Sequence, residues 1–502
     1  MSRAPAALML QGTGSDVGKS LLVAGLARAY VRRGLAVRPF KPQNMSNNAA
    51  VAADGGEIGR AQALQARACG IVPTVDMNPV LLKPHGDTGS QIIVQGQVYG
   101  QAKAADYYRL KDKLLPRVLE SFNRLRADAD LVLIEGAGST AEANLRASDI
   151  ANMGFAAAAA VPVMLVADID RGGALASLVG SWSLLDETDR RLLKGYIINK
   201  FRGDPQLFAP ATNIIRQHTK LDCYGVVEFF NQAHLLPAED AMALDYGKYG
   251  KNSAATSSKI KIAVPRLPRI ANFDDLDPLA AEPDVAVTIV PSGVPLPVDA
   301  DLILLPGSKA TLSDLAYLRS QGWDIDILAH HRRGGRVLGL CGGYQMLGRR
   351  IIDPMGIEGP AGDAPGLGLL DVETVLAPQK TLAQTRATEI TTGLSVQGYE
   401  IHMGITQGAD CTRPMLQIKD STRKQAIDGA ISADGKVSGC YLHGLFAADE
   451  FRRCYLEMLS GKKLVSTVAY DDQVERTLDA LADHIGRSVD LDRLLAVAAT
   501  PL

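Results

Sequence analysis

The first stretch with clear chemical potential is a glycine-rich turn near the N-terminus. It runs from Gly12 to Ser20, reads GTGSDVGKS, and lies between an apolar run and a helical pattern. Glycines let backbone N–H groups surround phosphate oxygens, and the start of the following helix adds positive potential. Lys19 would reach the terminal phosphates of a nucleotide, and the Ser20 hydroxyl would ligate Mg²⁺. The residues expected to bind the nucleotide are Gly14, Asp16, Gly18, Lys19 and Ser20.

Further polar residues follow other predicted strands and could complete this site. Glu135 follows four apolar residues, where an acid could orient the metal ion or simply cap a loop. Asp54, in a glycine-containing loop, is a weaker candidate for the metal, and Lys41 could add positive charge beside the phosphates. Asn199 could contact an adenine edge or, equally well, cap its own loop. The expected metal ligands are therefore Ser20, Asp54 and Glu135.

The second half of the chain carries a candidate nucleophile. Cys341 follows the apolar run Arg336–Leu340 and precedes two glycines and a helical pattern. A cysteine at such a strand-to-helix turn is presented above the sheet, and the helix N-terminus favours its thiolate form. The backbone N–H of Gly342, together with the loop at Gly307 after another strand, could form an oxyanion hole. The alternative is a buried structural cysteine, which the flanking glycines disfavour.

Thiolate chemistry also needs a general base. Among the eight histidines, His443 is the strongest candidate because it follows a short apolar strand and precedes a glycine. His402, in a glycine-flanked segment, is the second candidate, and it could instead line a substrate pocket or a domain interface. Cys341 with His443 thus predicts nucleophilic catalysis through a thioester.

Short apolar runs alternate with helical patterns in both halves of the chain. This alternation predicts parallel sheets with right-handed crossovers and ligands at the carboxyl ends of the strands. A polar, small-residue stretch without apolar periodicity interrupts the pattern over 246–259 and is expected to be a linker. The expected fold class is α/β in two domains. A P-loop NTPase sheet would cover 1–245, a second α/β domain 260–465, and a peripheral helical extension 466–502.

Composition sets broader limits on function. The 502 residues carry a net charge of -2, with no basic tract, so no nucleic-acid partner is expected. No stretch approaches the roughly 18–20 uninterrupted apolar residues of a membrane span, so no membrane association is expected. The six cysteines are scattered and form no CxxC pair, which argues against a disulfide framework or a zinc cluster and favours a reducing cytoplasm.

Ordered stretches of the chain resemble known families. The second half is similar to class I glutamine amidotransferase domains of the cobyrinate and cobyric acid synthase type, through LLPGSKAT (304–311), RVLGLCGGYQMLG (336–348), GYEIHMG (398–404) and CYLHGLF (440–446). The first half resembles dethiobiotin-synthetase-like P-loop domains. Over nearly its whole length the chain resembles the cobyric acid synthase family, through matches such as QGTGSDVGKS (11–20), FKPQNMSNN (40–48) and PRLPRIANFDDLDPL (265–279).

The resemblance implies a specific reaction. It is the amidation, with ATP and glutamine, of four peripheral carboxylates (b, d, e and g) of adenosylcobyrinic acid a,c-diamide during cobalamin biosynthesis. Ammonia released at Cys341 would attack an acyl phosphate formed in the P-loop domain. The implied cofactors are ATP and Mg²⁺, and the implied partners are the corrin substrate and glutamine. By resemblance, the nucleotide and metal roles fall on Lys19, Ser20, Lys41, Asp54, Glu135 and Asn199.

Two alternatives and one departure stay open at this stage. Cobyrinic acid a,c-diamide synthase shares the two-domain plan but would carry a Gly-Pro-Asp-Tyr type of motif where this chain has the run 41–48. A regulatory P-loop ATPase with an inactive amidotransferase-like module would have no need of an intact Cys341 and His443. Many class I glutaminases carry an acid two residues after the catalytic histidine, but here that residue is Leu445, which leaves the partner of His443 unassigned.

Overall fold

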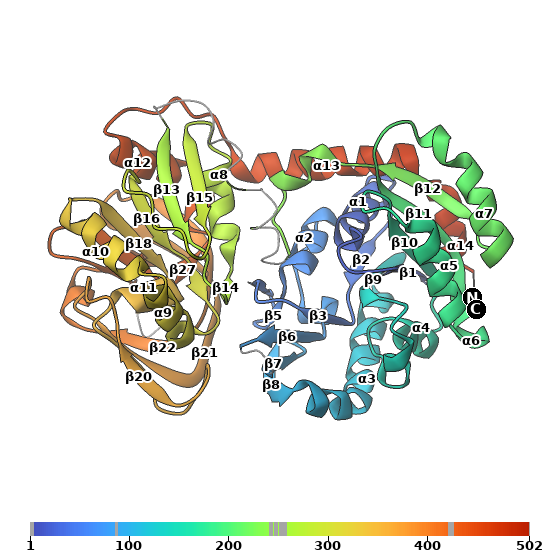
Figure 1. Cartoon of the computed structure of the whole chain (residues 1–502), viewed down its shortest axis with the longest axis horizontal. Coiled ribbons are helices and arrows are strands. Elements are labelled where there is room, and N and C mark those ends of the chain that lie inside the picture. Colours follow the sequence, from blue (N-terminus) through green and yellow to red (C-terminus); the bar gives the residue numbers. More distant parts are fainter. Residues whose placement is uncertain are drawn as a thin grey trace.

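The computed structural model describes residues 5–85, 89–239, 244, 249, 259–419 and 426–500. In this part of the chain, two α/β units stand side by side, and the long helix α13 (Tyr470–Ser488) runs from one to the other (Figure 1). Each unit contains a mainly parallel sheet, so the predicted two-domain α/β fold class is confirmed. The expected linker at 246–259 lies outside the described residues, apart from positions 249 and 259.

A six-stranded parallel sheet forms the centre of the N-terminal unit. Its strand order is β12-β11-β10-β1-β9-β2, so β1, which leads into the glycine-rich loop, lies in the interior of the sheet. In this order the strands are β12 (Cys223–Glu228), β11 (Leu193–Phe201), β10 (Val163–Asp168), β1 (Ala6–Gly12), β9 (Leu131–Ser139) and β2 (Val37–Phe40). Their apolar runs are almost continuous because helices cover both faces of the sheet.

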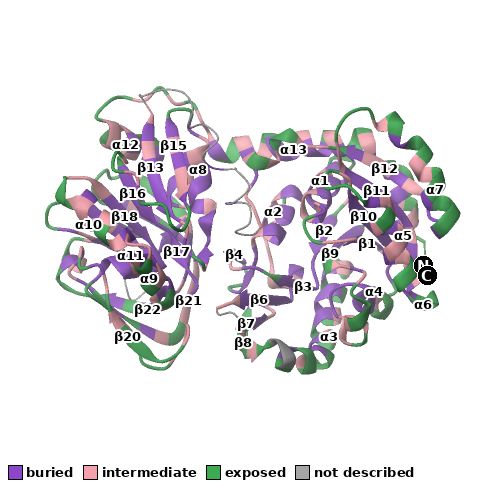
Figure 2. Ribbon diagram, viewed as in Figure 1, coloured by how far each residue is buried: buried purple, intermediate pink, exposed green. Residues whose placement is uncertain are grey.

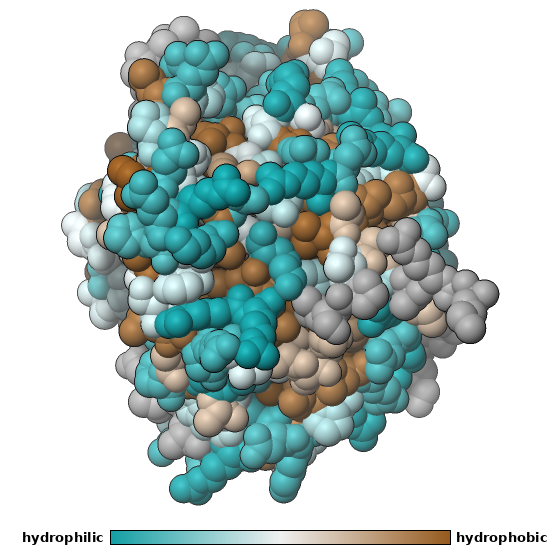
Figure 3. Space-filling view, turned by 90° about the vertical axis from the view of Figure 1, so that its right-hand side faces the viewer, coloured by the Kyte–Doolittle hydropathy of each residue, from teal (hydrophilic) through white to brown (hydrophobic). Residues whose placement is uncertain are grey.

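Helices flank the two faces of this sheet. One face packs against α1 (Lys19–Arg32) and α2 (Arg60–Ala68). The other packs against α3 (Ala104–Ala127), α4 (Met153–Ala159), α5 (Ala174–Leu184), α6 (Glu187–Leu192) and α7 (Ala209–Thr219). Figure 2 shows the buried strands between helices whose outward faces are exposed. The face turned to the viewer in Figure 3 is largely hydrophilic, and its hydrophobic areas are interrupted by polar side chains.

A small β-rich insert follows β2 and faces the second unit. Its four-stranded sheet contains β3 (Gln43–Met45), β6 (Val80–Pro84), β7 (Gly89–Val94) and β8 (Gln97–Lys103), while β4 (Ala49–Val51) pairs with β5 (Glu57–Gly59). Apolar residues of this insert, including Val51 and Leu81, pack with Tyr399 and Ile401 of the C-terminal unit. The insert therefore provides much of the contact between the two units.

The described part of the C-terminal unit contains two large sheets and one two-stranded sheet. The first has the order β15-β13-β16-β18-β26-β25 and is parallel except for its last pair. Its strands are β15 (Val285–Val290), β13 (Ile260–Pro265), β16 (Leu302–Leu305), β18 (Arg336–Leu340), β26 (Val437–Cys440) and β25 (Ala430–Ile431). The helices of this unit are α8 (Asp277–Ala280), α9 (Thr311–Ser320), α10 (Trp323–Arg332), α11 (Gly342–Leu347) and α12 (Asp449–Ser460).

The second sheet carries the long hairpin that faces the insert. Its order is β20-β19-β21-β22-β27; β23 (Leu416–Ile418) also pairs with β21, and β24 (Ile427–Asp428) pairs with β23. The strands are β20 (Gly362–Pro365), β19 (Arg350–Asp353), β21 (Glu373–Glu389), β22 (Ser395–Gln407) and β27 (Leu442–His443). A two-stranded pair, β14 (Ile270–Ala271) with β17 (Gly307–Ser308), lies beside the nucleophile turn. Among the described residues, no helix has the length and apolarity that crossing a membrane requires.

The final helices, expected as a peripheral tail, are part of the N-terminal core. Helix α13 and α14 (Leu491–Ala498) bury one face against α1 in the same hydrophobic cluster as β1. A Cβ on Gly25 of α1 would lie 2.3 Å from Ile485 Cδ1, so the two helices approach closely. Arg28 reinforces this contact through ion pairs with Glu475 and Asp479 at 2.6 and 2.8 Å. The apolar spacing of α13 did not reveal which unit it would cover.

Replacement of Ile485 by alanine should lower the stability of the N-terminal unit by about 2–5 kcal/mol, because it removes a fully buried side chain between α13 and α1. Chemical denaturation of the full chain measures this loss. Arg476→Ala, at an exposed position of the same helix, is the control and should stay within about 0.5 kcal/mol of the unaltered protein. Equal stability of the two variants would contradict the docking of α13.

Candidate active site

The glycine-rich loop connects β1 to α1 and is shaped by close backbone contacts. A Cβ on Gly12 would lie 2.6 Å from the Gly14 carbonyl oxygen, and Gly18 adopts a left-handed backbone with φ of 92°. A Cβ on Gly18 would also collide with the Asn199 amide. Lys19 Nζ donates to the Gly138 carbonyl at 2.9 Å, so the lysine lies across the mouth of the loop. This geometry suits a phosphate group ringed by backbone N–H groups.

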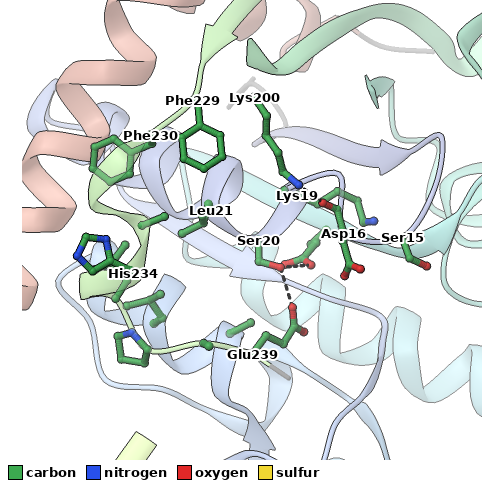
Figure 4. Close-up of a pocket in the computed structure, with 18 of the residues that line it drawn as sticks. Ser15, Asp16, Lys19, Ser20, Leu21, Lys200, Phe229, Phe230, His234 and Glu239 are labelled. Carbon is green, nitrogen blue, oxygen red and sulfur yellow. Dashed lines mark hydrogen bonds between the residues drawn. The ribbon is translucent and has the colours of Figure 1, made fainter. Parts of the chain in front are cut away.

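Behind the loop, a compact charged cluster gathers around Ser20. The Ser20 hydroxyl lies 2.8 Å from Glu135 Oε1 and 2.8 Å from Glu239 Oε2, and Figure 4 shows Ser20 and Glu239 pointing toward one another. Lys41 Nζ donates to the same two carboxylates at 2.8 and 2.7 Å. Gln65 donates to the other oxygen of Glu135 at 2.6 Å. The structure thus brings Ser20, Lys41 and Glu135 together as the sequence predicts.

Burial and charge set the protonation of this cluster. Burial opposes the charge of Lys41, but Glu135 and Glu239 outweigh it and raise the pKa of the lysine. The pKa of Glu239 is lowered, because Lys41 overcomes the cost of its burial. Burial lowers the pKa of Lys19, which Glu135 offsets only in part. The cluster therefore favours an ionised Glu239, which can accept a cation.

Hard oxygen donors of this kind fit Mg²⁺, which prefers one or two carboxylates together with substrate phosphates. Ser20 Oγ, Glu135 and Glu239 could supply the protein's share of the ligands. Among the described residues, no group of three or more His, Cys, Asp or Glu side chains is arranged to hold a metal ion by itself. A metal here would thus depend on the phosphates of the bound nucleotide.

Two predicted residues lie elsewhere or act differently. The Asp54 carboxylate is exposed and accepts from the Val75 N–H at 3.0 Å, so the structure does not bring it to the Ser20 cluster. Asn199 Nδ2 donates to the Val17 carbonyl at 2.8 Å and so contacts the glycine-rich loop from β11, which is separated from β1 by β10. Asp16 does line the cavity described next.

A cavity of about 1080 Å³ opens over the loop and extends to the C-terminal unit. Its charged end contains Lys19, Ser20, Lys41, Glu135 and Glu239. Its other side is apolar and aromatic, with Phe229 and Phe230 after β12 and with Val285 and Val287 of β15. Figure 4 shows Phe229 beside Lys200, and Phe230 and His234 on the side of the cavity away from Ser15 and Asp16. The cavity is large enough for a nucleotide and mixes charged and apolar walls, as ligand pockets do.

The candidate nucleophile occupies a strained turn. Cys341 joins β18 to α11 with φ of 51° and ψ of -109°, a conformation that a non-glycine residue rarely adopts. A Cβ on Gly343 would lie 2.1 Å from the Leu305 carbonyl oxygen, so glycine is required there. A Cβ on Gly342 would lie 2.8 Å from the Ser308 nitrogen, and one on Gly307 would lie 3.1 Å from His443 Cε1. The predicted oxyanion residues, Gly307 and Gly342, therefore meet beside Cys341.

The histidine beside the nucleophile has an acidic partner that the sequence did not reveal. His443 Nδ1 lies 2.7 Å from Asp275 Oδ2, and the other carboxylate oxygen accepts from the Gly444 N–H at 2.6 Å. His443 is fully buried and lines the same small cavity as Cys341. Burial opposes its positive charge, but Asp275 and Cys341 outweigh burial and raise the pKa of His443 to about 10. This cysteine–histidine–aspartate set suits general-base chemistry.

His402, the second candidate, lies on the other side of the cavity. Its ring stacks on Tyr441 with centroids 3.7 Å apart, and its Nε2 lies 3.9 Å from Glu400. Burial lowers its pKa, and its Nδ1 has no hydrogen-bond partner among the residues that the structure describes. Both histidines line the cavity near Cys341, but of the two only His443 is paired with an aspartate that orients the ring.

The cavity around Cys341 is small and is closed by the N-terminal unit. It measures about 30 Å³, room for one or two water molecules and not for glutamine. Lys83 of the insert lines it together with Lys380, and both lysines pair with the buried Glu57. Burial opposes ionisation of Glu57, but the two lysines lower its pKa to about 2. The cavity must therefore enlarge before it can hold glutamine, and a neighbouring cavity of about 460 Å³ shares Lys380 and His402 with it.

The comparisons with known proteins agree with this geometry. Residues 8–241 match a family model described as CobQ/CobB/MinD/ParA nucleotide binding domain, and residues 261–451 match one described as CobB/CobQ-like glutamine amidotransferase domain. The chain is therefore a glutamine-dependent amidotransferase joined to a nucleotide-binding domain.

Curated relatives narrow this class further. Cobyric acid synthase of Cereibacter sphaeroides is 58% identical over 98% of this chain and 99% of the relative. The cobyric acid synthases of Methylorubrum populi and Methylobacterium nodulans are each 57% identical, over 97% and 98% of this chain and 98% and 99% of the relatives. The chain belongs to the cobyric acid synthase family.

Two functional candidates were missed at the sequence level for different reasons. Asp275 precedes His443 by 168 positions, so no local spacing connects the two, although Asp275 lies within the matched stretch 265–279. Glu239 lies in a loop after β12, whereas metal-binding acids are expected at the carboxyl ends of strands. In both cases the pairing arises only from tertiary folding.

Replacement of Asp275 by asparagine should reduce glutaminase turnover by about 10²–10⁴-fold, because the ring of His443 loses the acceptor that fixes its Nδ1 proton. Steady-state release of glutamate measures the effect, and kcat should fall far more than KM rises. Asp284→Asn is the control, since Asp284 is an exposed aspartate of the same unit. A turnover of Asp275→Asn close to that of the control would contradict the triad.

Proposed function

We propose that this protein amidates the b, d, e and g carboxylates of adenosylcobyrinic acid a,c-diamide, using glutamine as the nitrogen donor and ATP as the activating nucleotide. The observation that carries the proposal is that one chain of this family holds a Cys341–His443–Asp275 site and a phosphate-binding site on the two sides of a single interface. The corrin and glutamine would be its small-molecule partners. The six unpaired cysteines favour a reducing cytoplasm as its compartment.

In the glutaminase half-reaction, the Cys341 thiolate attacks the side-chain amide of glutamine. The N–H groups of the Gly307 and Gly342 loops hold the developing oxyanion, and ammonia leaves as the thioester forms. His443, oriented by Asp275, moves the proton to the leaving group and then activates the water that releases glutamate.

In the synthetase half-reaction, a corrin carboxylate attacks the γ-phosphate of ATP. Lys19 and Lys41 stabilise the negative charge that spreads over the transferred phosphoryl group, and the aromatic wall at Phe229 and Phe230 would face the base of the nucleotide. Mg²⁺, held by Ser20 and Glu135 with Glu239, would neutralise charge on the phosphates. Ammonia then displaces phosphate from the acyl phosphate and leaves an amide.

The direct experiment is turnover with candidate corrins, ATP and glutamine, followed by mass analysis. Adenosylcobyrinic acid a,c-diamide should gain four amides in total. Amidation of cobyrinic acid only at positions a and c would instead identify the related diamide synthase. Absence of glutamate release under all these conditions would favour a regulatory ATPase with an inactive amidotransferase-like module.

Replacement of Cys341 by alanine should abolish synthesis from glutamine and leave synthesis from high ammonia largely intact. The thiol is needed only to release ammonia, whereas the phosphate-binding cluster lies in the other unit. Amide formation from each nitrogen source measures the separation. Equal loss with both sources in a folded variant would show that Cys341 is more than the glutaminase nucleophile.

Replacement of Lys19 by alanine should remove synthesis from both nitrogen sources by about 10²-fold or more, because both routes require the acyl phosphate and Lys19 is placed to hold the phosphates of ATP. Phosphate release and amide formation report the loss. Lys200→Ala, at another lysine that lines the cavity, provides a comparison with a milder effect. Retention of ammonia-dependent synthesis in Lys19→Ala would refute carboxylate activation at this loop.

A further inference from the structure

A buried pair of asparagines joins the two units next to both candidate sites. The backbone N–H of Asn272, in the C-terminal unit, donates to Asn48 Oδ1 at 2.7 Å. In return the N–H of Ala49 donates to Asn272 Oδ1 at 3.0 Å. Asn48 is 2% exposed and Asn272 is 4% exposed, so these hydrogen bonds are shielded from water. Neither residue has a role in the half-reactions proposed above.

At one end, this pair touches the phosphate-binding cluster. Asn48 Nδ2 donates to the Glu239 carbonyl at 3.1 Å, and the Ser46 hydroxyl donates to the same oxygen at 2.9 Å. The side chain of Glu239 in turn contacts Ser20 and Lys41. These are the groups that must exchange partners when Mg²⁺ and the phosphates of ATP bind. A change at Glu239 therefore reaches Asn48 through a direct contact.

At the other end, the pair touches the base of the glutaminase. Asn272 Nδ2 lies 3.2 Å from His443 Nε2. The orientation of the Asn272 amide is set from outside, because its carbonyl oxygen accepts from Ala49 and its NH₂ group must then face the histidine. Since Asp275 accepts the Nδ1 proton, Nε2 carries a lone pair when the ring is neutral, and the Asn272 amide engages this form of the ring. Asp275 and Cys341, by contrast, raise the pKa of His443 and favour the charged ring, so Asn272 acts against them.

This contact conflicts with the chemistry that His443 must perform. During catalysis Nε2 accepts a proton from the Cys341 thiol or from water, which makes the ring an imidazolium. An Nε2–H would face the NH₂ of Asn272, and two donors cannot form a hydrogen bond. The Asn272 amide, as Ala49 holds it, therefore opposes protonation at Nε2. A half-turn of the released amide would present its oxygen to Nε2–H and favour the imidazolium.

We propose that Asn272 is a positioning residue for His443 and that the Asn48–Asn272 pair forms an interdomain latch, which holds the glutaminase idle until nucleotide binding at Glu239 releases it. The inference rests on the proposed function, since hydrolysis of glutamine without amide formation is wasteful only if the ammonia is used at a separate synthetase site. It also agrees with the cavity of about 30 Å³ at Cys341, which Lys83 of the N-terminal unit helps to close and which must open for glutamine.

Two nearly isosteric variants of the full chain test the latch. Asn272→Asp keeps the acceptor for Ala49 and places an acceptor, instead of a donor, at His443 Nε2. Asn48→Asp keeps the acceptor for Asn272 and removes the donor to Glu239. Gln384→Ala is the matched control, because Gln384 makes an interdomain hydrogen bond to Val51 at 2.8 Å outside the chain of contacts.

The readouts are alkylation of Cys341 by iodoacetamide and glutamate release, each with and without ATP and Mg²⁺. In the unaltered protein and in Gln384→Ala, ATP should raise both rates. Asn272→Asp should raise both rates in the absence of ATP by roughly 3- to 10-fold, the effect expected from one or two buried hydrogen bonds. Asn48→Asp should make both rates independent of ATP, while ammonia-dependent amide synthesis continues.

The outcomes separate the latch from the proposed function. The latch is refuted if ATP changes neither rate in the unaltered protein, if Asn272→Asp without ATP matches Gln384→Ala, or if Asn48→Asp keeps the normal response to ATP. Alkylation and glutamate release require no corrin. Failure to amidate any corrin would therefore refute the proposed function and leave the test of the latch standing.

Discussion

The hydrogen bonds that Asn272 forms with Asn48 and Ala49 are the buried contact on which the proposed coupling of the two units depends. They lie where β4 of the insert meets the residues after β14, between Glu239 on one side and His443 on the other. Because both asparagines are buried, any relative movement of the units must break these bonds or carry both sites along. The candidate glutaminase site and the phosphate-binding cluster thus lie on the two sides of one buried interface.

Charged side chains are buried at this interface, and they form pairs of opposite charge. Glu57 accepts from Lys83 of its own unit and from Lys380 of the other, and Arg60 pairs with Asp274 across the interface. Removing one partner from such a buried set leaves an uncompensated charge, which costs far more than the pair contributes. A dry, charge-balanced interface also suits ammonia, which is mostly protonated in neutral water and is useful only as the free base.

Sequence reasoning recovered what depends on local order along the chain. The strands that carry or precede Gly12, Glu135 and Cys341 could be identified, since each combines an apolar run with glycines or a polar residue after it. Asp275 and Glu239 could not, because their partners are distant in sequence. The role of Asn48 could not be predicted from the sequence either, because turn formation, corrin contact and an interdomain bridge all use the same amide chemistry.

Helix α13 returns the chain to the unit where it began, and both ends of the described chain lie there (Figure 1). Along the sequence, the amidotransferase unit is therefore preceded and followed by segments of the N-terminal unit. Helix α13 follows the amidotransferase unit in the chain, so α1 lacks this apolar cover until that unit has been synthesised. A chain that stops before α13 would have an incompletely packed ATP site. The order of synthesis itself would therefore limit the consumption of ATP by fragments.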